Sequence, residues 1–196
     1  YHEVKVVLTL GGTGTLAGSS DLKLYADYIY LDTDERRRFA QVSHEYLIEQ
    51  VQEQSISTGN EDVVLNFNHP VKELIWSAGS TAADAGATSI LGGRWGLKLN
   101  GHERFSPRNV TYFTRAQVWQ HHTGYGSVVA ADGNGIGVYS FALKPEEHQP
   151  SGTCNFSRID NAVITNSSSR AAGVCYAVNY NVLRIMSGMG GLAYSN

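Results

Sequence analysis

Hydrophobic and polar residues alternate with a period of two along most of this 196-residue chain. In the first such segment, Val4, Val6 and Leu8 share one face and polar residues occupy the other. This alternation is typical of a half-buried β-strand. With the turn residues that separate the segments, it predicts nine strands, at residues 2–10, 21–32, 44–56, 62–67, 71–77, 95–99, 139–143, 156–164 and 173–186.

The last predicted strand is the longest, and its residues divide into two faces. We expect its larger apolar side chains to point into the core and two asparagines to point to a wetter side. The expected core residues are Val174, Tyr176, Val178 and Val182, and the expected outer residues are Asn179 and Asn181.

Helical patterns are short and fall between the predicted strands. Residues 33–41 are polar and compatible with a helix, and Asp32 is positioned to cap their first turn. Ser106 and Pro107 fit an N-cap and a first helical position, and apolar residues at helical spacing follow as far as Trp119. Short strands without crossover helices predict an all-β fold, an antiparallel sandwich or barrel. A jelly roll has eight strands, and the segment at 2–10 is then the surplus one.

Composition narrows the classes of function. At 196 residues, with 42% hydrophobic and 17% charged residues, the chain suits one globular domain. A net charge of −3 argues against a protein that coats nucleic acid, because neutralising phosphates requires a basic face. No apolar run approaches the roughly 18 residues of a membrane span. The chain opens at Tyr1, without an initiating Met or a signal peptide, so we expect it to be part of a longer protein.

Two cysteines, Cys154 and Cys175, are present, and their spacing fits no metal site. So low a count is typical of a reducing compartment, although the sequence alone leaves one disulfide possible. We expect free thiols.

The stretch from Gly12 to Ala17 matches the GxGxxA pattern of dinucleotide-binding proteins. That pattern functions only where a strand leads into a helix whose N-terminus faces the pyrophosphate. Here the next segment, 21–32, has a strand period. We therefore expect an inter-strand loop and no bound dinucleotide.

His121 and His122, with Glu146 and His148 downstream, invite a metal-site interpretation, because cupins are jelly rolls with histidine ligands. Adjacent residues on a strand point to opposite faces, so both histidines could not ligate one ion there. In the polar loop predicted for them, surface histidines are the simpler interpretation. Glu146 and its neighbour Glu147 are expected to be solvated, and no GxSxG elbow is present. We expect no catalytic residue, no cofactor and no metal.

Three triplets match the N-glycosylation sequon, beginning at Asn109, Asn155 and Asn166. Asn166 lies in a serine-rich stretch and is the best placed of the three by sequence.

The most specific stretch is YSFALKPEEHQPSGTCNFSRIDN, from Tyr139 to Asn161. Pro145 and Pro150 interrupt its strand pattern, which predicts a strand, a long ordered corner and a second strand. The stretch closely resembles the C-terminal part of the major capsid proteins of nucleocytoplasmic large DNA viruses (phycodnavirus, mimivirus and iridovirus types). Three further runs resemble the same family in order: LYADYIYLDTDERRRFAQVSHEYLIEQVQ (24–52), NHPVKELIW (68–76) and YNVLRIMSGMGGLAYSN (180–196).

This resemblance implies a non-enzymatic structural protein with two successive jelly rolls, of which this chain is the second. Residues 1–20 would be the last strand of the first roll with a glycine-rich linker, and residues 21–196 the C-terminal roll. The resemblance also implies homotrimeric, pseudo-hexagonal capsomers that tile an icosahedral shell around an internal membrane. Partners would be neighbouring capsomers, minor capsid proteins and, indirectly, that membrane. The location would be the virion capsid, assembled in the host cytoplasm.

Two other classes remain open from the sequence. A glycan- or receptor-binding jelly roll on a virion surface would need an exposed aromatic platform, for which Trp95 and Tyr125 are the candidates. A cupin-like metalloenzyme would need bound metal.

Overall fold

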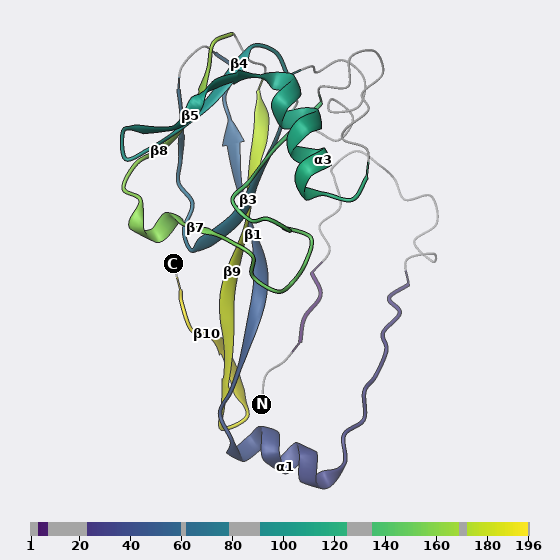
Figure 1. Ribbon diagram of the computed structural model, residues 1–196. Coiled ribbons are helices and arrows are strands. Elements are labelled where there is room, and N and C mark those ends of the chain that lie inside the picture. Colours follow the sequence, from purple (N-terminus) through teal and green to yellow (C-terminus); the bar gives the residue numbers. More distant parts are fainter. Residues whose placement is uncertain are drawn as a thin grey trace. The chain divides into compact units, whose positions relative to one another are not determined.

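The computed structural model describes residues 4–7, 23–59, 62–78, 91–124, 135–168 and 172–195 (Figure 1). Its helical segments are α1 (Thr33–Gln41), a π-helical turn η1 (Tyr112–Ala116), α3 (Gln117–His121) and a 3-10 turn η2 (Phe156–Arg158). Its strands are β1 (His44–Ile56), β2 (Val63–Leu65), β3 (Pro70–Ala78), β4 (Arg94–Leu99), β5 (His102–Asn109), β6 (Ile136–Ser140), β7 (Cys154–Asn155), β8 (Ala162–Asn166), β9 (Gly173–Met186) and β10 (Met189–Leu192).

The strands form two sheets with the topology of a jelly roll (Figure 1). The first sheet has the order β1-β9-β3-β6, with β10 added to β9 and β7 added to β3. The second has the order β2-β8-β4-β5. The registers recorded for β3 with β6 and β9, and for β8 with β2 and β4, are all antiparallel. The predicted all-β, eight-stranded antiparallel jelly roll with short helices in its connections is confirmed.

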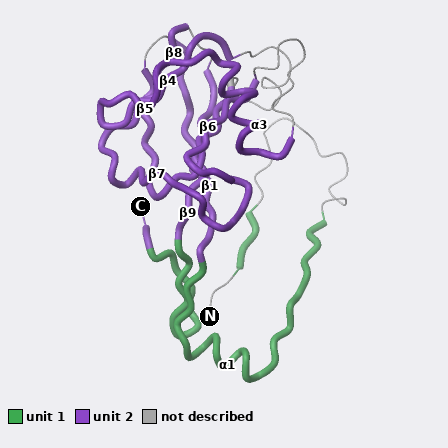
Figure 2. Tube along the Cα trace, in the orientation of Figure 1, with its two compact units in different colours: residues 1–46, 182–193 green, residues 47–181, 194–196 purple. Residues whose placement is uncertain are grey.

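The chain forms two compact units (Figure 2). The first comprises residues 1–46 and 182–193 and contains α1 and β10. The second comprises residues 47–181 and 194–196 and contains the strands from β2 to β8. β1 and β9 contribute residues to both units.

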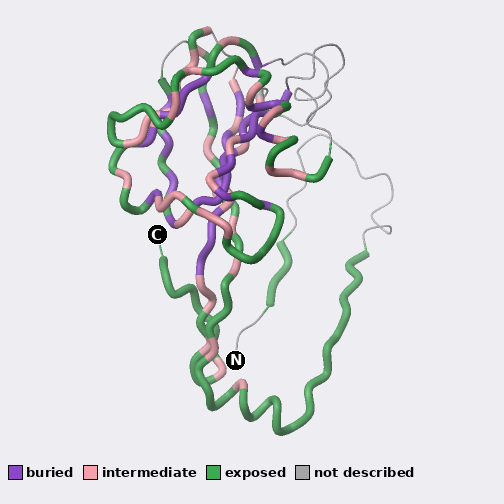
Figure 3. The backbone as a smooth tube through the Cα atoms, viewed as in Figure 1, coloured by how far each residue is buried: buried purple, intermediate pink, exposed green. Residues whose placement is uncertain are grey.

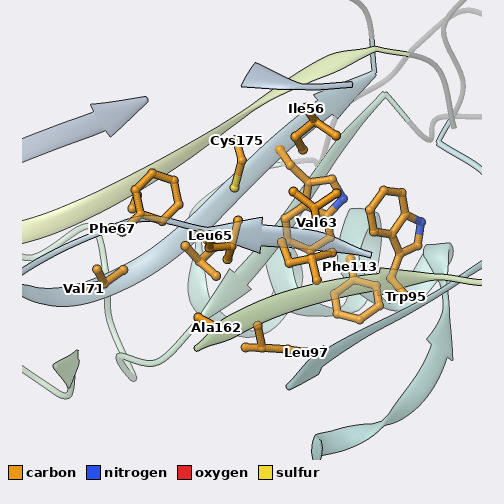
Figure 4. Packing of buried hydrophobic residues seen from close by; sticks show 14 of the residues in the cluster. Ile56, Val63, Leu65, Phe67, Val71, Trp95, Leu97, Phe113, Ala162 and Cys175 are labelled. Atoms are coloured by element: carbon orange, nitrogen blue, oxygen red, sulfur yellow. The ribbon is translucent and has the colours of Figure 1, made fainter. Parts of the chain in front are cut away.

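The hydrophobic core lies in the second unit and draws side chains from both sheets (Figures 3 and 4). Trp76 of β3 packs against Trp95 of β4, with 5.6 Å between ring centroids, and against Phe113, with 5.3 Å. The same core cluster contains further apolar residues that are less than 9% exposed: Ile56, Val63, Leu65, Phe67, Val71, Leu74, Leu97, Phe156, Ala162 and Ile164. Burying a Val, Leu, Ile or Phe side chain stabilises the fold by about 1.5–3 kcal/mol.

Several predicted elements match the structure. β1 and β9 have the predicted bounds, 44–56 and 173–186. α1 spans 33–41, and Asp32 caps it as expected: its Oδ1 accepts hydrogen bonds from the amides of Asp34 (2.6 Å) and Glu35 (3.4 Å).

The predicted faces of β9 are wrong. The fully buried positions are Cys175, Ala177 and Asn179, and Asn181 is also buried at 3% exposure. Val174 and Tyr176 are only half-buried. The buried face of β9 carries the small residues Cys175 and Ala177, and both asparagines have hydrogen-bond partners, so their burial leaves no unsatisfied polar atom.

The predicted strand at 21–32 is also wrong over its described part. Residues 23–31 are exposed and belong to no sheet, and Tyr25, Ile29 and Tyr30 are 85–91% exposed. The period of two reflects an extended segment with large apolar side chains, but no described strand pairs with it. In the predicted strand at 2–10, the described residues 4–7 likewise belong to no sheet and are exposed.

A strand takes the place of the predicted helix start at Ser106–Pro107. β5 runs through Pro107 because it is the edge strand of the second sheet, where a missing amide costs no ladder hydrogen bond. The carbonyl of Pro107 accepts two hydrogen bonds from the Arg94 guanidinium of β4, at 2.8 and 3.2 Å. The helix begins only after β5. Because β5 was not among the strands predicted from the alternation, the eight strands of the roll are not the set that the pattern predicted.

The predicted strand at 156–164 is interrupted. Asn155 accepts a hydrogen bond from the Ser157 amide (3.1 Å) and caps the turn η2, and the strand resumes as β8 at Ala162.

Candidate functional site

The corner, residues 144–152, connects β6 to β7 as the prolines predicted. Pro145 is completely buried, and the Lys144 amide donates to Ser151 Oγ (2.9 Å), so the segment closes on itself. The corner also bonds to the body of the roll, because Tyr180 Oη on β9 donates to the carbonyl of His148 (3.2 Å). The corner is therefore an ordered connection.

Two consecutive charged residues, Lys72 and Glu73, lie buried in β3 beside the corner, at 2% and 6% exposure. Their burial coincides with a β-bulge. Val71 and Glu73 pair with the consecutive β9 residues Asn179 and Val178, which leaves Lys72 as the extra residue. The carbonyl of Lys72 accepts the amides of Phe141 (2.9 Å) and Ala142 (3.2 Å), just ahead of the corner.

Glu73 belongs to a cluster with His122 and Glu146, hereafter the Glu73–His122–Glu146 cluster. His122 Nε2 lies 2.9 Å from Glu73 Oε2, and His122 Nδ1 lies 3.2 Å from Glu146 Oε1. Glu146 also accepts hydrogen bonds from Thr123, at 2.9 Å from its amide and 2.7 Å from its hydroxyl. The imidazole of His122, the residue after α3, thus connects β3 to the corner.

Lys72 begins a second chain of charges that also ends in the corner. Its Nζ lies 2.7 Å from Glu49 Oε1 of β1 and 5.4 Å from the centre of the Tyr180 ring. His148 Nδ1 lies 3.4 Å from the same Glu49 oxygen, on a side chain that is 63% exposed. A buried lysine requires such a partner, because an isolated buried charge is costly.

The pKa values of the two carboxyls are shifted in opposite directions, by burial at Glu73 and by hydrogen bonds at Glu146. Desolvation raises the pKa of Glu73 above its ordinary value, although His122 and Lys72 act against that rise. The hydrogen bonds from Thr123 hold the pKa of Glu146 below its ordinary value. The two carboxyls on either side of His122 therefore differ in how readily they hold a proton.

The expectations for these residues need correction. His122 is not an ordinary surface histidine, since it is only 18% exposed and faces two carboxylates, and Glu146 is bound instead of freely solvated. His121, the last residue of α3, instead contacts the carbonyl of Leu143 through Nδ1 (3.0 Å). No group of three or more His, Cys, Asp or Glu in the described ranges has the arrangement of a metal site.

Sequence reasoning missed Glu73 and Lys72 as members of a site. The available signal was the run NHPVKELIW, in which two charged residues interrupt a strand that is otherwise apolar. Charged residues are almost never fully buried unless they are paired. Their ion-pair partners, Glu49 and His122, lie 23 and 49 residues away in the chain and leave no spacing to recognise.

The three sequon asparagines differ in their surroundings. Asn109 is exposed, and its Oδ1 accepts hydrogen bonds from the amide and hydroxyl of Thr111, both at 3.0 Å. Asn155 and Asn166 are half-buried, and each accepts a hydrogen bond from the amide two residues ahead. Judged by exposure, Asn109 is a more accessible glycosylation site than Asn166, whereas the sequence suggested the reverse order.

The two cysteines lie far apart on the first sheet. Cys154 pairs with Val71, and Cys175 pairs with Trp76, five residues further along β3. Burial raises the pKa of the Cys175 thiol to about 12 and also raises that of Cys154. Both thiols are free in the structure.

The prediction that Trp95 belongs to an exposed aromatic platform is wrong, because Trp95 is 2% exposed and belongs to the core. Tyr125 and the GxGxxA stretch at 12–17 lie outside the described residues. Trp119 of α3 is the exposed tryptophan, at 81%. In the described part of the chain, no helix has the length and apolar character needed to cross a bilayer.

The two antiparallel sheets place this chain in the class of all-β jelly-roll proteins. The family model described as "Large eukaryotic DNA virus major capsid protein" matches residues 35–89 and 93–191. The major capsid protein of Pyramimonas orientalis virus is 50% identical, over 100% of this chain and 56% of its own length. That of Paramecium bursaria Chlorella virus 1 is 38% identical, over 100% of this chain and 61% of its own length.

Solved structures agree with these sequence matches. A chain of the PBCV-1 virus capsid superimposes with a TM-score of 0.70 and 38% identity, over 86% of this chain and 56% of that one. The Faustovirus major capsid protein, at 15% identity and a TM-score of 0.51, shares the fold.

The chain belongs to the major capsid protein family of large eukaryotic DNA viruses. The prediction of a structural viral capsid protein that is not an enzyme is confirmed by this membership. The chain spans only about 56–61% of the length of the curated relatives named above.

Proposed function

We propose that this chain is the C-terminal jelly roll of a subunit with two successive jelly rolls, and that the subunits form homotrimeric capsomers of pseudo-hexagonal outline. The observation that carries the proposal is a complete eight-stranded roll in a chain that spans little more than half of its relatives. The uncovered part of each relative leaves room for a further domain. These capsomers would tile an icosahedral shell.

The uncovered apolar residues at the start of the chain support a neighbouring roll. Val4, Val6 and Val7 are 70–90% exposed, and Tyr25, Ile29 and Tyr30 are 85–91% exposed. Large apolar side chains in such numbers are normally covered by another surface. The proposal assigns residues 1–20 to the last strand of the first roll with its linker, and residues 21–196 to the C-terminal roll.

The proposed partners are other copies of the subunit, neighbouring capsomers and minor capsid proteins, with an inner viral membrane as an indirect partner. The virion capsid is where the named relatives belong. Assembly in the host cytoplasm is the remaining part of the proposal, and free thiols at Cys154 and Cys175 are compatible with it.

Light scattering on two versions of the protein tests this proposal. The full-length protein is expected to have the mass of a trimer. The 196-residue chain alone, with its apolar segments uncovered, is expected to aggregate or form mixed oligomers. A well-behaved monomer from both versions would contradict the proposal.

A further inference from the structure

The Glu73–His122–Glu146 cluster has more acceptors than a neutral histidine can satisfy. An ionised carboxylate only accepts hydrogen bonds, and a neutral imidazole carries a single N–H. Yet both ring nitrogens of His122 lie within hydrogen-bond distance of carboxylate oxygens, at 2.9 and 3.2 Å. Both contacts are hydrogen bonds only if the cluster holds one additional proton.

That proton can reside on His122 or on Glu73, and in either case both contacts of the imidazole are hydrogen bonds. On His122 it creates an imidazolium that donates to both carboxylates. On Glu73 it creates a carboxylic acid that donates to Nε2, while Nδ1–H donates to Glu146. Without it, one ring nitrogen directs a lone pair at a carboxylate, and that contact becomes repulsive.

We propose that the Glu73–His122–Glu146 cluster is a proton-dependent clamp, which holds the corner (residues 144–152) to β3 and to the end of α3, and which opens when the shared proton is lost. The contacts of Glu146 with His122 and Thr123 are the corner's side-chain attachments at this point. Losing the proton makes one of the two contacts of His122 repulsive, which weakens the connection between β3, His122 and the corner.

Other charged groups surround the clamp but do not replace its proton. Lys72 lies next to Glu73, but its Nζ is paired with Glu49 at 2.7 Å. His148 faces that same Glu49, and Lys144 faces Glu147 at 3.0 Å. His121 contacts the Leu143 carbonyl, for which a single N–H is sufficient.

The direction of the pH response follows from the two carboxyls. Burial raises the pKa of Glu73, so the stability from its proton is present below the ordinary value of 4.5 and is lost as pH rises through the raised value. The pKa of Glu146 is lowered, so its contribution is present above 4.5 and is lost as pH falls through the lowered value. The clamp is therefore closed where Glu73 holds its proton, and it opens as pH rises through the raised pKa of Glu73.

Hydrogen exchange of the full-length protein, corrected for intrinsic rates, tests the clamp. In a titration from about pH 5 to about pH 9, protection of residues 122–123 and 144–152 is expected to fall by about tenfold as pH rises through the raised pKa of Glu73, the equivalent of one pKa unit of linkage. In Glu73→Gln, the amide donates to Nε2 and a neutral His122 still donates to Glu146. The fall in that variant is expected to be less than about twofold.

Two further variants make the result decisive. His121→Asn, a matched control on the adjacent histidine, is expected to keep the wild-type pH response. His122→Gln cannot carry the proton, so its protection is expected to be low and independent of pH; it also serves if Glu73→Gln does not fold. Unchanged wild-type protection across this range, or a wild-type pH response in His122→Gln, would overturn the proposal.

Discussion

Asn179 on β9 accepts a hydrogen bond from Gln52 on β1, with 3.0 Å between Oδ1 and Nε2, although Asn179 is completely buried. Gln52 also donates to the carbonyl of Asn68 (2.7 Å) and accepts from the Asn68 amide (3.0 Å). Asn179 in turn donates to the carbonyl of Tyr180 (3.1 Å). One amide pair thus joins two strands to the segment before β3.

Replacing Asn179 by Leu should destabilise the roll by about 1–3 kcal/mol, because partners that were paired become buried without a hydrogen bond. Gln52→Leu removes the same bond from the other side. The double variant should lose less than the sum of the two, with a coupling of about 0.5–3 kcal/mol. Urea denaturation of the four proteins measures this, and strict additivity would show that the bond contributes nothing.

Gly137 on β6 packs against the Trp76 ring, and a Cβ added there would lie 2.5 Å from Cε2. Because the added methyl group would clash with this ring, Gly137→Ala should cost about 1–3 kcal/mol through overpacking. Gly92→Ala is the matched control, because nothing lies within 4 Å of its added Cβ. Thermal denaturation compares the two, and equal midpoints would contradict the packing described for Trp76.

Cys154 and Cys175 should be recovered as free thiols. Their partners on β3 are five residues apart, about 16 Å along the strand, whereas a disulfide requires Cα atoms within about 7 Å. Alkylation without reduction, followed by peptide mass spectrometry, should label both cysteines. A linked Cys154–Cys175 peptide would contradict the register of the first sheet.

If the protein is made in a host that glycosylates it, Asn109 should be modified before Asn166. Asn109 is exposed, whereas Asn166 is half-buried and lies close to Gly93, where an added Cβ would be 2.6 Å from its Oδ1. Intact-mass analysis should therefore show a loss of glycan in Asn109→Gln and little change in Asn166→Gln. The reverse result would show that exposure in this fold does not govern the choice.

The sequence predicted the fold where one local signal was sufficient. Alternation fixed the limits of β1 and β9, and the Asp32 cap fixed the start of α1. Prediction from the sequence failed where tertiary contacts determine the structure. Pro107 fits a helix start as well as an edge strand, and the apolar period of residues 23–31 does not reveal whether a partner strand exists. The faces of β9 were reversed because polarity alone does not reveal that Asn179 is paired.

The candidate site was less accessible to sequence reasoning. His122 and Glu146 were recognised as reactive residue types, but the decisive partner, Glu73, is 49 residues from His122. Such pairing depends on the arrangement of β3 against the end of α3, which no spacing rule encodes.

A subunit with two jelly rolls is the central claim, and electron cryomicroscopy of the purified full-length protein tests it most directly. Class averages are expected to show threefold symmetric particles with a pseudo-hexagonal outline, in which this chain occupies alternate lobes. Particles with one lobe per subunit, or with twofold symmetry, would contradict the account.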